Sequence, residues 1–213
     1  MASALIDLSH AIRDGLVTYQ GLPPVRICDY LTREASRARY AGGAEFQIGR
    51  IDMVANTGTY VDVPFHRFAD GDDLDGVALA RLAELPAICI DLDELASLRG
   101  RSLRGMAVLV RTGWSRYFGT PAYFHDHPFV PTAEAHALRD AGVALVGIDS
   151  HNIDDTAARN DRPVHTALLG AGIPICEHMR NLEALPADGF TFTAAPPRVV
   201  GMGTFPVRAF ARL

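Results

Sequence analysis

The sequence predicts a mixed α/β domain that spans residues 1–213. Short apolar runs rich in branched side chains alternate with segments rich in Ala and Leu, which predicts strands and helices in turn. The predicted strands outnumber the helices, yet several segments repeat a helix-then-strand order. Neither an all-β sandwich nor a regular doubly wound sheet therefore fits. Because 48% of the residues are apolar and 21% are charged, the chain can bury a full hydrophobic core.

The elements follow from the local pattern of side chains. Apolar runs predict strands at residues 46–54, 87–92, 107–111, 143–148 and 173–176. Helices are predicted at residues 77–84 and 133–140. The second helix would have Thr132 as its N-cap and would stop at Gly142, and a short helix from His165 would break at Gly172. In the first strand the two-residue apolar period slips beside Gly49, which predicts a β-bulge.

Charge and cysteine content exclude several classes of protein. Twenty Lys and Arg against twenty-five Asp and Glu give a net charge of −5, so nucleic acid is not an expected partner. Cys28, Cys89 and Cys176 form no C-x-x-C pair, which argues against a disulfide framework and a thiolate zinc site. Residues 1–8 show no signal-peptide pattern and no apolar run approaches the roughly 20 residues that cross a bilayer. A cytoplasmic protein with no membrane partner is expected.

The densest polar cluster lies at residues 56–67. In an extended chain Asn56, Tyr60 and Asp62 point to one face. Pro64 cannot donate to a sheet, so the strand should leave the sheet there and place His66 on a loop at the rim, where sites are often built. An alternative stays open on these residues alone, in which the cluster caps a turn and His66 binds a backbone carbonyl.

A second polar cluster, at residues 147–154, follows the apolar run 143–148. In α/β sheets, sites favour the crevice outside the carboxyl ends of strands, which draws attention to Asp149 and His151. The alternative for His151 is a solvated side chain beside an Asx turn.

A third cluster runs from His165 to Glu177, a carboxylate that follows a short apolar run. A carboxylate at that place is expected to be partly buried, and a buried charge needs an opposite charge or a cation. Together with Asp62, these two side chains are ligands of the kind that hold zinc or manganese. Sequence spacing does not establish that the three segments meet.

The order of several motifs carries a family resemblance. These motifs are Asp7-Leu8-Ser9-His10, Asn56-Thr-Gly-Thr-Tyr-Val-Asp62-Val-Pro-Phe-His66, Arg111-Thr-Gly-Trp114, Val146-Gly-Ile-Asp149, His165 with Leu168-Leu169 and Glu177, and Pro206-Val-Arg208. From about Leu5 to Ala211, the chain resembles the cyclase family, which includes bacterial kynurenine formamidase (arylformamidase) and isatin hydrolase. The resemblance implies a mixed-sheet swivelling β/β/α fold and metal-dependent hydrolysis of amides and cyclic amides. It also implies a homodimer or homotetramer.

This chain departs from the family motif His-x-Gly-Thr-His-x-Asp-x-Pro-x-His at two positions. Asp62 matches the metal-ligand Asp, and His66 matches the last His, which is thought to act as general acid and base. Asn56 and Tyr60 stand where the motif has its two metal-binding histidines. A neutral amide is a weak ligand and a phenol with a pKa near 10 is rarely deprotonated, so the metal set that uses those histidines should be lost.

The second metal set of the family survives, and it predicts a single divalent ion, zinc or manganese, on Asp62, His165 and Glu177. The ion would activate a water for attack on an amide carbonyl while His66 moves the proton. Tyr60 would donate a hydrogen bond to the developing oxyanion.

Further side chains are candidates for contact with a small-molecule substrate. They are Asn56, Arg67, Trp114 and His151, of which His151 is also a candidate extra ligand. Arg111 and Arg208 are further candidates to grip a substrate carboxylate, and Phe65 to line an aromatic pocket. Each has a structural alternative, on the surface for the arginines and in the core for the rings.

Two other functions compete with the metal-dependent hydrolase. One is a metal-free hydrolase or lactonase, in which Asp62 and His66 act together while Asn56 and Tyr60 supply hydrogen bonds. The other is a small-molecule-binding relative that kept the fold and lost catalysis.

Overall fold

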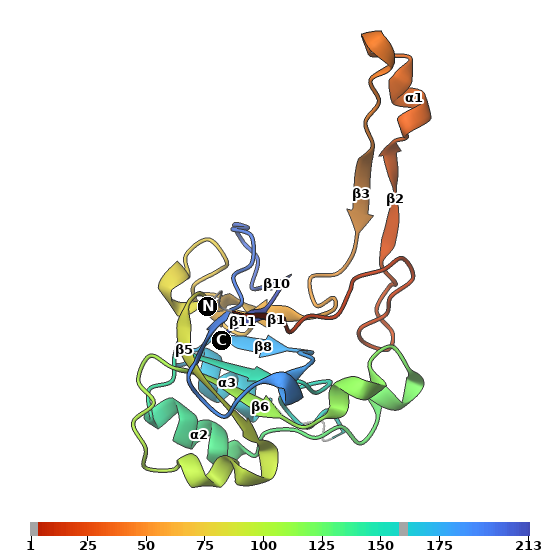
Figure 1. The fold of residues 1–213 in the computed structure, drawn as a ribbon. Coiled ribbons are helices and arrows are strands. Elements are labelled where there is room, and N and C mark those ends of the chain that lie inside the picture. Colours follow the sequence, from red (N-terminus) through yellow and green to blue (C-terminus); the bar gives the residue numbers. More distant parts are fainter. Residues whose placement is uncertain (1–3, 158–161) are drawn as a thin grey trace.

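The computed structural model describes residues 4–157 and 162–213, and its central feature is one mixed β-sheet (Figure 1). Among these residues, nine strands lie in the order β1-β11-β9-β5-β6-β7-β8-β4-β10. Their bounds are β1 Leu5–Asp7, β4 Tyr60–Asp62, β5 Leu85–Asp91, β6 Ala107–Arg111, β7 Leu145–Ile148, β8 Ile175–Glu177, β9 Phe190–Thr193, β10 Thr204–Pro206 and β11 Phe210–Arg212. Strands β5 to β8 are parallel, and the other pairs are antiparallel. The mixed α/β class predicted from the sequence is confirmed.

The central strands are continuous apolar runs because both faces of the sheet are covered. On one face, Val108 and Val110 of β6 belong to a core that also contains Leu138 of α2 (Thr132–Asp140) and Leu168 of α3 (Pro163–Leu169). On the other face, Leu109 belongs to a second core, which the loops and flanking strands build. The sheet therefore separates two hydrophobic cores.

Helix α2 begins one residue earlier than predicted. Pro131 is the N-cap, with extended backbone, and no side chain caps the helix. Thr132 is already helical, so its prediction as N-cap is wrong, because the fixed φ of Pro131 places the turn before it. Gly142 has a φ of +78° and ends the helix as predicted.

The helix predicted at residues 77–84 is wrong. The structure has only a short 3-10 segment at Leu79–Arg81. The backbone N–H of Glu84 donates to Oγ1 of Thr193 at 3.0 Å, and Glu84 has a φ of 55°. A helix that reached Glu84 would need this N–H for the carbonyl of Ala80 and a negative φ. The other 3-10 segments are Ala41–Gly43, Pro64–His66, Leu92–Leu98, Trp114–Tyr117, Pro121–Phe124 and Leu182–Ala184.

A two-stranded arm, formed by β2 (Arg26–Leu31), α1 (Arg33–Arg37) and β3 (Ile48–Asp52), projects from the body (Figure 1). Strand β3 is the centre of the strand predicted at residues 46–54. An irregularity is present opposite Gly49, as predicted, but it belongs to β2 and not to β3. Asp29 pairs with Gly49 and Leu31 pairs with Ile48, so the register shifts between Asp29 and Leu31.

Of the remaining strand predictions, one matches the structure and three differ from it at their ends. Strand β6 has the predicted bounds, whereas β5, β7 and β8 each differ by one or two residues at one or both ends. Strands β1, β2, β9, β10 and β11 were not predicted. Among the residues that the structure describes, no helix has the length and apolar character to cross a membrane.

Candidate functional site

The site lies at one side of the sheet, where β8, β4 and β10 are neighbours. Tyr60 pairs with Glu177 across β4 and β8, and Asp62 pairs with Thr204 across β4 and β10. Paired residues share a face of an antiparallel sheet, as do residues two apart along a strand. These four side chains therefore point to one face, while Val61 faces the hydrophobic core. This is the alternation predicted for Tyr60 and Asp62.

After β4 the chain leaves the sheet at Pro64, as predicted, in the short turn Pro64–His66. The Thr204 hydroxyl donates to Oδ1 of Asp62 and lies 2.8 Å from Nδ1 of His66. Because that hydroxyl has only one proton, His66 donates to it from Nδ1, which leaves Nε2 of a neutral ring free to accept a proton. The His66 side chain is 35% exposed, so this atom can be reached from solvent.

A glycine permits the close approach of β10 to this turn. The backbone N–H of Val63 donates to the carbonyl of Gly203, and a Cβ at Gly203 would collide with the backbone of His66. Only glycine therefore fits at this position without displacing His66.

Helix α3 brings His165 to the same face. Its Nδ1 lies 2.6 Å from Oδ2 of Asp154, and its Nε2 lies 3.6 Å from Oδ2 of Asp62 and 3.9 Å from Oε1 of Glu177. Asp154 also accepts the backbone N–H groups of Val164 and His165. One carboxylate thus satisfies the first turn of α3 and fixes the orientation of the imidazole.

Two fully buried carboxylates face this imidazole. Burial raises the pKa of Glu177 to about 7, although the attraction of His165 opposes the rise. Burial alone would lower the pKa of His165, but its hydrogen bond with Asp154 and the nearby carboxylates of Asp62 and Glu177 raise it to about 10. Asp62 and Glu177 are both 0% exposed. A positive charge between these groups would offset the cost of their burial.

The donor set fits a divalent metal ion. One ligand atom from each of Asp62, His66 and His165 lies within 4.8 Å of the others. Oδ2 of Asp62 is buried and has no hydrogen-bond partner among the described residues. Carboxylate oxygen and imidazole nitrogen are the ligands that zinc and manganese accept, and the Asp154–His165 pair is the usual support of a metal-binding histidine.

The structure brings Glu177 to the same place, with its oxygens in hydrogen bonds. Oε1 accepts the backbone N–H of Ile153 at 2.6 Å, and Oε2 accepts the Tyr60 hydroxyl at 2.6 Å. The Tyr60 proton is therefore directed at Glu177 rather than into the cavity.

Tyr19, which sequence reasoning missed, lies at the centre of a buried hydrogen-bond network. Its hydroxyl is 2.7 Å from the Tyr60 hydroxyl, 3.0 Å from Nδ2 of Asn152 and 3.2 Å from Nε2 of His178. It also lies 3.4 Å from Oε2 of Glu177. Burial raises the pKa of Tyr19 and of Tyr60 well above 10, so both phenols stay protonated.

These side chains surround a cavity of about 390 Å³. It is lined by Tyr19, Leu22, Asn56, Tyr60, His66, Arg67, Asn152, Arg162, His165 and Glu177. Of the predicted substrate contacts, Asn56 and Arg67 thus lie at the cavity.

Trp114 and His151 lie elsewhere. Nε1 of Trp114 donates to the carbonyl of Tyr123 at 3.1 Å. The His151 ring packs behind Tyr19, with ring centroids 4.6 Å apart, and its Nδ1 is buried without a partner among the described residues. Burial lowers the pKa of His151 to about 3, so the ring is neutral.

The other candidates from the sequence have local partners. Arg111 pairs with Asp91, and Arg208 pairs with Asp7. Asp149 accepts the backbone N–H groups of Thr112 and Gly113 and so holds the loop after β6.

Sequence reasoning missed Tyr19, Asn152, Asp154 and Thr204. Asn152 and Asp154 belong to the polar cluster at residues 147–154, so a signal for them was present. Tyr19 and Thr204 have no local signal, since their roles come from contacts with residues more than 40 positions away.

Comparisons with known proteins cover nearly the whole chain. A family model described as "Putative cyclase" matches residues 6–155. A kynurenine formamidase from Salinibacter ruber is 29% identical over 217 residues, which cover 98% of this chain and 97% of that protein.

Solved structures share the fold. Isatin hydrolase A from Ralstonia solanacearum matches with a TM-score of 0.81 at 23% identity, over 99% of this chain and 92% of that chain. A protein described as a predicted metal-dependent hydrolase from Bacillus stearothermophilus matches with a TM-score of 0.76 at 26% identity, over 100% and 99% of the two chains. These matches confirm the fold that the sequence motifs predict.

Proposed function

Because the chain belongs to the cyclase family, we propose that it hydrolyses the C–N bond of a small amide or cyclic amide with one divalent metal ion. Membership of the family confirms the resemblance carried by the sequence motifs. Relatives that match along the full chain are named kynurenine formamidases, which supports an arylformamidase-like reaction. The single observation that carries the proposal is the buried Oδ2 of Asp62, which has no hydrogen-bond partner within residues 4–157 and 162–213 and lies 3.6 Å from Nε2 of His165.

Asp62 and His165 would hold the ion together with Glu177, whose Oε1 lies 3.9 Å from Nε2 of His165. His66, which also lies within reach of Asp62 and His165, would transfer protons instead. Zinc or manganese suits these ligands. When bound, the ion would polarise the substrate carbonyl and lower the pKa of a water. Asp154 is hydrogen-bonded to Nδ1 of His165, so that Nε2 of the same ring faces the buried carboxylates of Asp62 and Glu177. Tyr60 holds Oε2 of Glu177 in place.

His66 is proposed as the general acid and base. Thr204 engages its Nδ1, so Nε2 is the atom that accepts the proton of the attacking water and returns it to the leaving nitrogen. An imidazole in this role contributes about a hundredfold or more to the rate.

Tyr60 is proposed to act through Glu177. Its hydroxyl proton is used in the bond to that carboxylate, so donation to an oxyanion would require this bond to be exchanged. Asn56 and Arg67, which line the cavity, are proposed to contact a small-molecule substrate.

The test measures metal content and turnover together. The purified protein should contain zinc or manganese and should hydrolyse an aryl formamide or a cyclic amide, with activity lost in chelator and restored by metal. Full activity in chelator would favour a metal-free hydrolase or lactonase. Saturable binding of the same amides without turnover would favour a non-catalytic relative.

We also propose that the chain forms a homodimer or homotetramer in the cytoplasm. Exposed apolar side chains on the arm favour such an assembly, because a second copy would cover them. They are Ile27, Tyr30, Tyr40, Phe46, Ile48 and Ile51, which are 42% to 75% exposed.

A further inference from the structure

A pocket of about 560 Å³ shares no lining residue with the catalytic cavity. Three arginines, Arg13, Arg116 and Arg180, line it together with His10, and we call this group the arginine pocket. Glu183 is the acidic residue of its lining. Positive charge thus gathers here in a chain whose net charge is −5, which favours an anion at this place.

The guanidinium groups of the arginine pocket form no ion pair with the residues that the structure describes, unlike Arg111 and Arg208. Arg116 donates to the carbonyl of Gly113 at 2.9 Å, and Arg180 donates to Oδ1 of Asn181 at 3.2 Å. Each guanidinium has five N–H donors, so most of this capacity is available to a ligand.

His10 supplies an independent observation. Its Nε2 is buried and has no hydrogen-bond partner among the described residues, although buried polar atoms normally have one. Burial, with the nearby charges of Arg180 and Arg13, lowers the pKa of His10 to about 4. A bound anion would offset the repulsion from these arginines and so raise the pKa of the His10 ring.

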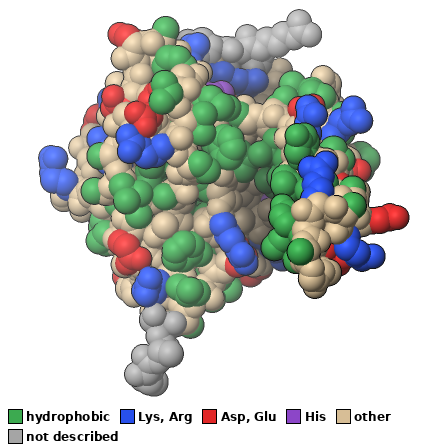
Figure 2. All heavy atoms as spheres, turned by 90° about the horizontal axis from the view of Figure 1, so that it is seen from above, with side chains coloured by type: hydrophobic (Ala, Val, Ile, Leu, Met, Phe, Trp, Pro, Cys, Tyr) green, Lys and Arg blue, Asp and Glu red, His purple; other side chains and the backbone are tan. Residues whose placement is uncertain are grey.

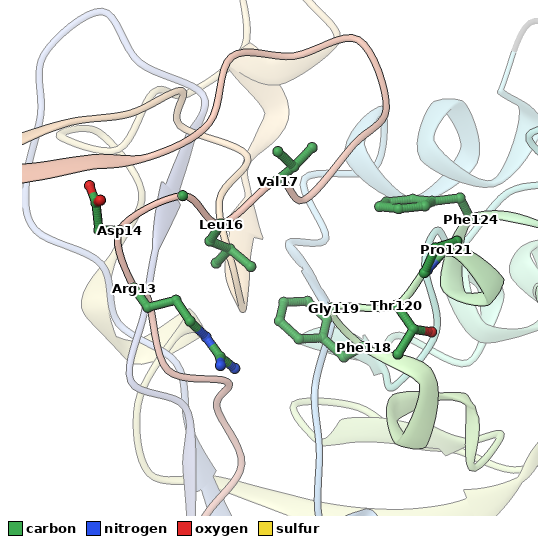
Figure 3. Close-up of a pocket in the computed structure, with 10 residues that line it drawn as sticks. Arg13, Asp14, Leu16, Val17, Phe118, Gly119, Thr120, Pro121 and Phe124 are labelled. Carbon is green, nitrogen blue, oxygen red and sulfur yellow. The ribbon is translucent and has the colours of Figure 1, made fainter.

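A second hollow, with both polar and apolar lining, adjoins the arginine pocket. Arg13 and Phe118 line both, and the second hollow has a volume of about 460 Å³. Figure 3 shows residues 13–17 on one side of this hollow and residues 118–124 on the other. Leu16, Val17 and Phe124 line it with apolar side chains, and Asp14 and Thr120 line it with polar ones. The His10 ring of the arginine pocket stacks on Phe118, with ring centroids 3.7 Å apart. Phe118 lines both hollows, so the two are continuous at this ring.

We propose that the two adjoining hollows form a binding site for a small organic anion, a carboxylate or a phosphate monoester with an apolar body. The anionic group binds the three arginines beside the His10 ring. The apolar body lies beside Phe118, between residues 13–17 and 118–124. The site is separate from the catalytic cavity, so the inference does not depend on the proposed hydrolysis.

The single tryptophan of the chain provides the readout. Trp114 lies between Gly113 and Ser115, which both line the arginine pocket. The full protein is titrated with phenylacetate, phenyl phosphate, inorganic phosphate and the neutral 2-phenylethanol while Trp114 fluorescence is followed. At least one of the two organic anions should give a saturable change, and the one that does identifies the head group. Inorganic phosphate should bind more weakly and 2-phenylethanol should give no saturable change.

Matched variants locate the binding. Arg13→Gln and Arg180→Gln should each weaken the affinity by about tenfold, the effect of losing one hydrogen bond to a charged group. Arg101→Gln, a change at an exposed arginine outside the pocket, should leave affinity unchanged. Asp62→Asn should also leave it unchanged, because the catalytic cavity is a different place. Melting curves check that each variant is folded.

Two results would overturn the proposal. One is the absence of a saturable change with either organic anion up to about 10 mM, which is weaker than ordinary ligand binding. The other is unchanged affinity in both Arg13→Gln and Arg180→Gln.

Discussion

At the scale of single residues, Asp62 is the most important residue for the proposed metal site. It is fully buried, and one of its carboxylate oxygens has no hydrogen-bond partner among the described residues. Asp62→Asn removes the charge and keeps the size, so bound metal should fall and turnover should drop by about a hundredfold or more. Elemental analysis and steady-state rates measure both effects. Asp93→Asn, at an exposed carboxylate, is the control. Full metal occupancy in Asp62→Asn would contradict the ligand assignment.

We expect Asn56 and Tyr60 to limit the number of metal ions, because they stand where the family motif has two histidines. We expect about one ion per chain in the natural protein and about two in the Asn56→His, Tyr60→His double variant, since imidazole binds zinc where amide and phenol do not. Metal titration followed by elemental analysis gives the ratio. An unchanged ratio would mean that these positions do not form a metal site in this chain.

The protonation of His165 makes metal affinity depend on pH. Its pKa is raised to about 10, so at neutral pH the ring carries a proton that a metal must displace. Affinity should therefore rise with pH, by about tenfold per unit for one displaced proton. Below about pH 7 the rise should be steeper, because the pKa of Glu177 is raised to about 7. Competition with a chelator at several pH values tests this, and an affinity independent of pH would contradict it.

At the scale of elements, α3 depends on one buried side chain. Asp154 accepts two backbone N–H groups of the first turn and the side chain of His165. Its pKa is lowered because these hydrogen bonds outweigh burial, which raises it. Asp154→Ala should cost about 2–4 kcal/mol of unfolding free energy and weaken metal binding about 10- to 100-fold.

Denaturant unfolding and metal titration measure the two effects of Asp154→Ala separately. Asp140→Asn, at the exposed end of α2, serves as the control and should change neither. A variant that loses stability but binds metal as tightly as the natural chain would show that Asp154 only caps the helix.

Element prediction succeeded where a segment is buried on both faces. Strand β6 is a continuous apolar run and has the predicted bounds. Strands β1, β10 and β11 have three residues each, too few to show a period, and tertiary pairing alone defines them. The helix predicted at residues 77–84 failed because its backbone bonds to a distant segment.

At the scale of the whole molecule, the arm is the segment with the least support from the body. Ile27 and Ile51 pair across its two strands and are 42% and 56% exposed. An isolated two-stranded hairpin is marginally stable in water, so we expect a second copy to cover it. Light scattering should report a dimer or tetramer for the natural chain and a smaller species for Ile51→Glu. A monomeric natural chain would contradict this expectation.

The sequence by itself determined the family, the mixed α/β class and the identity of Asp62, His66, His165 and Glu177 as candidate site residues, because these depend on residue type and order. Only the tertiary structure decided which of the candidates meet. Tyr60 and Glu177 are 117 positions apart, and Asp62 and Thr204 are 142 positions apart. Their contacts arise from the order of strands β8, β4 and β10 in the sheet. Local periodicity carries no information about that order, since it is set by the burial of two cores along the whole chain.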